Sequence, residues 1–289
     1  MAELRPKRAK SHLRLKMNNR MLCRMLMLAA SYTVLSVPCV SAATLRDRPK
    51  VSGVWFERRS DSAITKKHEW LLALSLRRIT GYADLQFASD GSLSLGNPSE
   101  QAGGSAEARR ILMTAICSSS LFVIEDFSGS RSVTFGQAVP EQFRVDRGVG
   151  ISQLWRLRLD FDDFQQMEAP SDVRAAFDEG FTFFHELLHG LGYKDVSGYQ
   201  ELGACEEIVN RVRSELGLPV RIRYFGEAWR VTERLTSVRL GFRSHPAHGN
   251  SSRSETRYLF FLLKESPECS ADVWALTRVD RRCQPDYRD

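Results

Sequence analysis

The chain has 289 residues, enough for one large domain or two small ones, and its apolar (43%) and charged (26%) fractions are ordinary for a globular protein. The net charge of +6 is concentrated at the N-terminus, because residues 1–43 contain eight Lys or Arg and one Glu, which leaves 33 basic and 34 acidic residues elsewhere. A body with a net charge of −1 gives no reason to expect binding to nucleic acid or to an anionic membrane surface.

The first 43 residues have the composition of a secretory leader. A basic segment up to Arg24 precedes an apolar run that ends before Pro38, and small residues suited to cleavage follow. The apolar run is too short to span a bilayer comfortably, so a membrane anchor is the less favoured alternative. We expect 1–43 to be a leader and 44–289 to be one exported domain, periplasmic or secreted, with no membrane span after cleavage.

Four cysteines follow the leader: Cys117, Cys205, Cys269 and Cys283. In an oxidising compartment four cysteines can form two disulfides with three possible connectivities, of which Cys269–Cys283 is the most local. Their spacing is wrong for a zinc ribbon.

The first half of the body predicts a mixture of strands and helices. Residues 44–60 look extended, 64–79 fit either a buried helix or a strand, and 105–117 have the apolar spacing of a helix. Alternating apolar residues on both sides of Asp90-Gly91 predict a hairpin. Further strands are expected at 121–124, 133–135 and 155–161.

The strongest helical signal follows. Ser171-Asp172 is a candidate N-cap, and apolar residues then recur at three- and four-residue steps as far as Leu191. Gly180 is the weak point of this pattern, whereas Gly190 and Gly192 are suited to a helix end. We expect one helix, buried on most sides.

This helix carries the pattern H-E-x-x-H at His185, Glu186 and His189. Residues four apart lie on the same face of a helix, so the two imidazoles can bind one metal ion. Glu186 is then placed to take a proton from a water on the open side of that ion. Two helix histidines can also be ordinary core residues, but the closing glycines and a downstream carboxylate favour a metal site.

Residues 181–195 resemble the active-site helix of the zincin metallopeptidases. The resemblance implies that His185 and His189 bind Zn²⁺ and that Glu186 is the general base. The run H-E-L-L-H-G-L-G-Y-K-D is also similar to the metzincin form, which places Asp195 at the third zinc ligand. Metzincins carry a methionine beneath the metal, downstream of the helix, but this chain has no methionine after Met167.

A second expected helix, 203–213, offers an alternative third ligand. In the gluzincin branch of the family a glutamate on a following helix completes the site, and a residue four positions later steadies the first histidine. Glu206 and Asn210 resemble that pair. For Glu206 alone, a position on a solvated helix face is the more ordinary interpretation.

The remaining elements are strands and a polar loop. Strands are expected at 220–224, 237–242 and 257–263, the last one buried by its composition. Some zincins polarise the substrate carbonyl with a distant His or Tyr, and the weak candidates for this role are His245, His248, Tyr193, Tyr199 and Tyr258. His68 lies far from any motif and is expected to be structural or exposed.

These features predict an α+β, zincin-like fold: a mixed sheet, the active-site helix and a smaller C-terminal subdomain. The expected function is an exported zinc metallopeptidase acting on proteins or peptides, an endopeptidase in preference to an exopeptidase. The alternatives are a zincin-shaped binding or structural protein without turnover, and a secreted effector that cleaves one specific protein. The oligomeric state and the substrate are left open.

Overall fold

The computed structural model describes residues 53–58, 62–130, 134–141, 153–195, 201–224, 226–232, 235–244, 254–264 and 277–278. All of them belong to the unit Pro49–Asp289, which is distinct from the unit Met1–Arg48. The expectations for the leader, Tyr199, His245, His248, Cys269 and Cys283 concern residues outside the described ranges. No helix in the described part is long and apolar enough to cross a membrane.

A four-stranded mixed sheet forms the first layer, in the order β1 (Gly53–Phe56), β4 (Leu121–Asp126), β6 (Leu154–Leu159) and β5 (Gly136–Glu141). β1, β4 and β6 are parallel, whereas β5 is antiparallel to β6 and forms an edge of the sheet. This edge strand later forms one wall of the candidate site.

Two strand boundaries differ from those predicted. The strand expected at 133–135 begins instead at Gly136, because Phe135 adopts a left-handed φ of 62°, which a strand does not accommodate. β6 ends at Leu159, since the Asp160 carboxylate accepts the main-chain N–H groups of Asp162 and Asp163 and thereby caps α4 (Phe161–Gln165). Phe161 is therefore the first residue of a helix and not the end of a strand.

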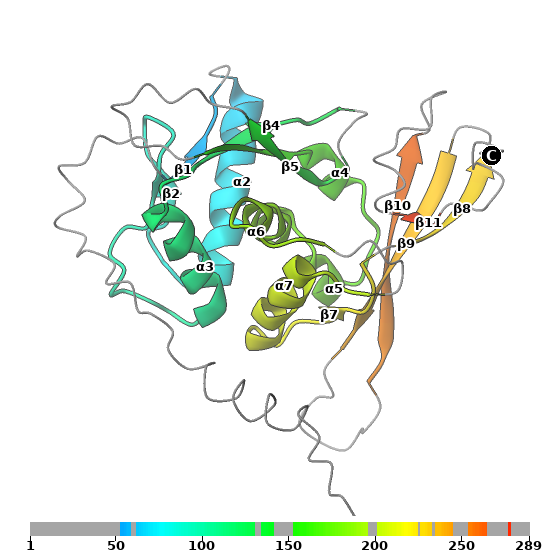
Figure 1. The fold of residues 1–289 in the computed structure, drawn as a ribbon. Coiled ribbons are helices and arrows are strands. Elements are labelled where there is room, and N and C mark those ends of the chain that lie inside the picture. Colours follow the sequence, from blue (N-terminus) through cyan, green and yellow to red (C-terminus); the bar gives the residue numbers. More distant parts are fainter. Residues whose placement is uncertain are drawn as a thin grey trace, which may run out of the picture. The chain divides into compact units, whose positions relative to one another are not determined.

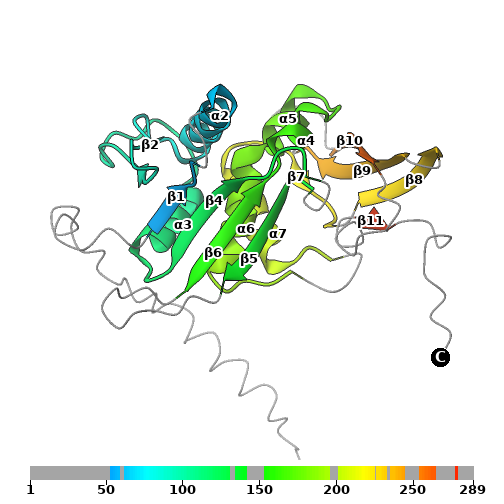
Figure 2. The same cartoon turned by 90° about the horizontal axis from the view of Figure 1, so that it is seen from above.

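The helices α3 (Ala106–Cys117), α6 (Glu179–Gly190) and α7 (Ala204–Glu215) lie on the same face of this sheet (Figure 1), and the view in Figure 2 agrees. α2 (Ala63–Thr80) contacts both α3 and α6. Ser62 caps α2, which settles the ambiguous segment 64–79 as a helix, and Ser105 caps the predicted helix 105–117. The core between these elements contains Leu72, Leu76, Ile111, Phe122, Leu157, Phe183, Phe184 and Leu188.

The single long helix expected after Ser171 is in fact two helices. α5 (Ser171–Ala176) ends where Phe177 leaves the helical region at φ −142° and ψ 81°. Asp178 then starts α6, because its carboxylate accepts the N–H groups of Gly180 and Phe181. Although the apolar spacing continues without a break, the N-cap at Asp178 therefore begins a second helix.

A second sheet follows from the C-terminal part: β7 (Val220–Arg221), β8 (Gly226–Thr232), β9 (Leu235–Arg243), β10 (Thr256–Lys264) and β11 (Thr277–Arg278). Its order is β10-β9-β8-β11, with β7 also paired to β9, and it packs beside α4 and α5 (Figure 1). The strand expected at 257–263 to be buried by its composition is buried on one face only: Leu259 and Phe261 are buried, whereas Leu262 is 51% exposed. The predicted hairpin is present as β2 (Gln86–Phe87) and β3 (Leu93–Ser94).

Candidate metal centre

The position of α6 is fixed by close packing at both ends. A Cβ on Gly180 would lie 2.3 Å from Oγ of Ser75 in α2, and one on Gly190 would lie 2.5 Å from the Phe122 ring of β4. The weak point predicted at Gly180 is therefore a site of close helix packing. The helix ends at Gly190, as predicted, and Gly192 turns the chain with a φ of 93°.

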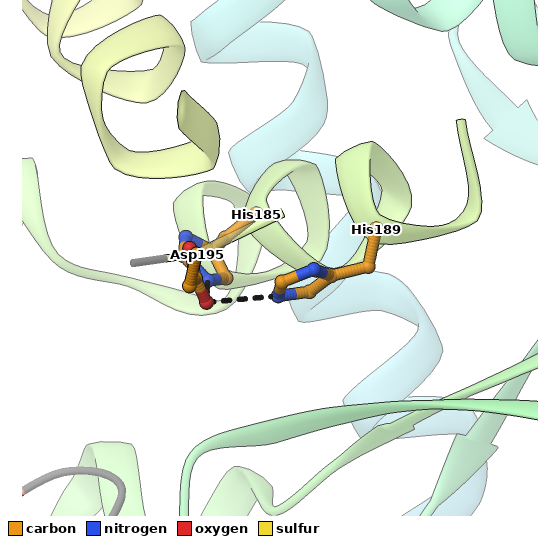
Figure 3. Close-up of side chains that lie close together, drawn as sticks. All are labelled: His185, His189 and Asp195. Atoms are coloured by element: carbon orange, nitrogen blue, oxygen red, sulfur yellow. Dashed lines mark hydrogen bonds and ion pairs between the residues drawn. The ribbon is translucent and has the colours of Figure 1, made fainter. Parts of the chain in front are cut away.

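This turn brings Asp195 back onto the two histidines of α6 (Figure 3). Oδ2 of Asp195 lies 3.3 Å from Nε2 of His185 and 3.1 Å from Nε2 of His189. Within the described part of the chain, these three residues form the group whose potential ligand atoms lie within 4.8 Å of one another. The His185, His189 and Asp195 named from the sequence thus meet at one point.

The donor set fits a zinc ion. With zinc–ligand distances near 2.0–2.1 Å, the donor atoms of a tetrahedral site lie about 3.3–3.4 Å apart, close to the two separations observed. Oδ1 of Asp195 is buried and accepts no hydrogen bond from any described residue. A buried carboxylate oxygen without a donor is costly unless a cation neutralises it.

The other ring nitrogens face hydrogen-bond acceptors. Nδ1 of His189 lies 3.3 Å from the carbonyl oxygen of Tyr193. Nδ1 of His185 lies 3.2 Å from Oε2 of Glu206, a distance of an ion pair, although the angle is not that of a good hydrogen bond. Since a carbonyl and an ionised carboxylate only accept, each Nδ1 is placed to carry a proton. With a metal ion bound beside Asp195, the lone pair of each Nε2 would then face that ion.

Glu206 is neither on a solvated helix face nor beside the Nε2 atoms of the two histidines, the two positions considered for it from the sequence. It is 2% exposed, so the interpretation as part of a solvated helix face is wrong. Its oxygens contact Arg213 and Arg221, and it meets His185 on the side away from Asp195. Asn210, expected to steady His185, instead bonds Nη1 of Arg213 and the main chain of Arg221, because it lies further along the face of α7.

The carboxylates determine the protonation of the histidines. Burial lowers the pKa of His185, but its hydrogen bond to Asp195 and the neighbouring carboxylates of Glu206 and Glu186 outweigh burial and raise the pKa to about 10. Burial raises the pKa of Asp195, but the two histidines outweigh burial and hold it well below its ordinary range. In Glu186 burial dominates and raises the pKa. The acidic groups together make a field that favours a cation.

Glu186 lies between the histidines and the edge strand β5. Its carboxylate accepts the main-chain N–H of Ala138. Glu186 and Ala138 line a cavity of about 510 Å³ together with His185 and His189. Clefts of this size are common for small-molecule and peptide-sized ligands. A carboxylate beside the possible metal and a free strand edge therefore open into the same space.

Tyr224 is the main site residue that was not predicted. Its ring stacks on His185, with centroids 5.6 Å apart and planes at 22°, and it lines the same cavity. Burial, then the charges of Asp195 and Glu186, raise the pKa of its hydroxyl, so the phenol stays protonated. An aromatic ring thus packs against the first histidine of the cluster.

The weaker candidates are dispersed. Tyr193 lines the cavity and is 37% exposed, but its contribution to the histidines is its carbonyl oxygen. Tyr258 lies on β10, where Arg239 packs over its ring. His68 is structural, as one of the two interpretations held: it is 2% exposed, with Nδ1 2.7 Å from Oδ2 of Asp126.

The cysteines correct the disulfide expectation. Cys117 is disulfide-bonded, to a partner outside the described residues. Cys205 is a free, buried thiol, with Sγ 3.6 Å from Nδ1 of His189. The four cysteines after the leader therefore do not pair into two disulfides, because α7 turns Cys205 into the core beside the histidines. Burial and nearby carboxylates raise the pKa of this thiol, so it stays protonated.

Comparison with protein-family models, with curated proteins and with solved structures finds no match to this chain.

Proposed function

We propose that this protein is an exported, zincin-like zinc metallopeptidase that cleaves peptide bonds within a chain. The observation that carries the proposal is that Oδ2 of Asp195 lies 3.3 Å from Nε2 of His185 and 3.1 Å from Nε2 of His189. Glu186 lines the same cavity beside them. His185, His189 and Asp195 would hold the metal. A bound zinc ion supplies a Lewis acid for the substrate carbonyl and lowers the pKa of a coordinated water to about 7.

The residues of the chain would handle the protons and the substrate. Glu186 takes a proton from the attacking water while the oxygen of that water bonds to the carbonyl carbon of the substrate. The same carboxyl then passes that proton to the nitrogen as the C–N bond breaks, so that the products are a carboxylic acid, which releases its remaining proton to water, and a free amine. Tyr224 lines the cavity with a protonated hydroxyl that is hydrogen-bonded to Asp195, so it would orient this carboxylate toward the metal.

The edge strand supports a peptide substrate. β5 has no strand on its outer side among the described residues, and an extended chain can pair with such an edge through main-chain hydrogen bonds. Ala138, whose N–H meets Glu186, lies in the middle of β5, so partners continue in both directions. A substrate held on both sides of the reacting bond is the arrangement of an endopeptidase.

Two features support export. Residues 1–43 have the composition of a secretory leader, and Cys117 forms a disulfide, a bond typical of oxidising compartments.

The proposal is tested on the purified chain by metal analysis and by mass spectrometry of a library of unstructured peptides. We expect about one zinc per chain, cleavage inside the peptides, loss of cleavage with a chelator and recovery with added zinc. Zinc without cleavage would favour a binding protein, and cleavage of one folded protein only would favour a specific effector. A chain that binds no zinc would contradict the proposal.

The contact between β5 and α6 gives a separate prediction. A Cβ on Gly136 would lie 2.5 Å from Cγ2 of Thr182 and 3.1 Å from Cγ of Glu186. Gly136→Ala should therefore push the strand away from the helix, lowering stability by about 1–3 kcal/mol and kcat/KM by roughly tenfold or more. Urea unfolding and peptide cleavage measure the two effects.

A second substitution makes this test specific. Thr182→Ser removes the methyl group nearest to the added Cβ, so the double variant Gly136→Ala/Thr182→Ser should recover much of the lost kcat/KM. Equal activity of Gly136→Ala and the unaltered chain would show that the approach of β5 to α6 is unimportant for the reaction.

A further inference from the structure

Three buried charged side chains outside the ligand set form a network behind His185. Glu206, Arg213 and Arg221 are 2%, 1% and 4% exposed. Nη1 of Arg213 is hydrogen-bonded to Oε1 of Glu206, and Nη1 of Arg221 lies 3.4 Å from Oε2. Removing three charges from water is expensive, so the network requires a structural or functional explanation.

Each arginine is held by further contacts. Nε of Arg213 donates to the carbonyl oxygen of Ala176 at 2.7 Å, and Nε of Arg221 donates to that of Arg223 at 3.0 Å. Oδ1 of Asn210 accepts from Nη1 of Arg213 at 2.8 Å and from the main-chain N–H of Arg221 at 2.9 Å. The two guanidinium groups are thus fixed by contacts with α5, α7 and the segment that follows β7, and they hold the Glu206 carboxylate in one place.

That place is beside Nδ1 of His185. Oε2 of Glu206 is 3.2 Å from this nitrogen, while Nε2 of the same ring faces Asp195. His189 is held differently, by the neutral carbonyl of Tyr193. The two histidines therefore receive unequal support, with an ionic group behind only one of them.

We infer that Glu206 is a positioning residue for His185 and not a metal ligand, and that Arg213 and Arg221 are the counter-ions that keep it there. Glu206 fixes the tautomer with the proton on Nδ1 and the direction in which Nε2 points. Acceptors behind a metal-binding histidine typically change metal affinity or activity by 10- to 100-fold when they are replaced. This inference rests on the proposed zinc site.

The test compares zinc affinity, by competition with a chromophoric chelator, among variants of the full chain. Glu206→Gln keeps the shape of the side chain and removes its charge, and should weaken zinc binding 10- to 100-fold. Glu207→Gln makes the same change at the next residue of α7, which is exposed, and should bind zinc as the unaltered chain does.

A second pair of variants covers the case in which Glu206→Gln fails to fold. Glu206→Gln/Arg221→Met removes one charge of each sign, so the net charge of the network is unchanged, whereas Arg221→Met alone keeps the carboxylate. We expect a zinc affinity at least tenfold weaker for the double variant than for Arg221→Met, at similar urea midpoints. With zinc saturating, kcat should fall while KM stays nearly constant, because His185 is misdirected and the peptide-binding edge is intact.

The outcomes separate the two claims. Equal zinc affinity in the double variant and in Arg221→Met would overturn the role of Glu206 and leave the proposed function standing. An unaltered chain that binds no zinc would overturn both.

Discussion

Glu186→Gln should abolish peptide cleavage while the protein keeps its metal. Glutamine has the size of glutamate and retains an oxygen to accept the Ala138 N–H, so α6 and β5 should stay in contact. It cannot take a proton from water. General-base catalysis contributes roughly 10²- to 10⁴-fold, and we expect kcat to fall by at least 10³-fold. Among the described residues, no other carboxylate near the histidines is available as a base, because Asp195 would bind the metal and Glu206 is paired with arginines.

The measurement is kcat for a cleaved peptide, alongside zinc content and the urea midpoint. Glu179→Gln is the matched control, since it makes the same change in the first turn of the same helix, away from the cavity. Cleavage by Glu186→Gln at the rate of the control would rule out Glu186 as the base. Loss of zinc together with cleavage would indicate that Glu186 supports the metal instead.

The meeting of His185, His189 and Asp195 follows from local chain geometry, although the sequence left open whether Asp195 or Glu206 joins the two histidines. Histidines four apart share a face of any helix, and Gly192, with its φ of 93°, returns the chain to that face within a few residues. Asp195 is reached by this turn alone. No contact with a distant segment is needed to bring His185, His189 and Asp195 together.

The surroundings of the cluster depend on distant contacts and were not predictable in the same way. Gly136, on β5, and Tyr224, in the connection between β7 and β8, reach the cavity from segments on either side of α6 in the sequence, and neither is part of a motif. The burial of Glu206 had a partial signal: Glu206, Asn210 and Arg213 recur at steps of four and three, which places a polar stripe on one face of α7. Arg221, the other counter-ion, comes from β7, beyond the reach of helix periodicity.

The break between α5 and α6 illustrates a different limit. Phe177, Phe181 and Phe184 continue the apolar period of a helix through Asp178, so periodicity alone predicts one element. The hydrogen bonds of Asp178 begin a new helix at this point. Its carboxylate accepts two N–H groups of α6, and it also accepts a hydrogen bond of 2.6 Å from Oγ of Ser75 in α2. A single capping side chain with a tertiary partner outweighs the pattern around it.

The second large effect is expected at the third ligand. Asp195→Ala should weaken zinc binding by more than the 10- to 100-fold typical of groups that only support a ligand, because it removes a donor atom and the charge that offsets the ion. Cleavage should be lost with the metal. Chelator competition measures the affinity, and Lys194→Ala, an exposed neighbour in the same turn, is the control.

The comparison with Glu206 decides which carboxylate completes the site. Oδ2 of Asp195 lies on the Nε2 side of both histidines, whereas Glu206 meets His185 at Nδ1 and its oxygens already contact two guanidinium groups. Removing a metal ligand should weaken zinc binding more than removing a residue that only positions a ligand. Asp195→Ala should therefore bind zinc more weakly than Glu206→Gln. The reverse order would mean that α7 supplies the third ligand, with His185 turned to present Nδ1 to the metal.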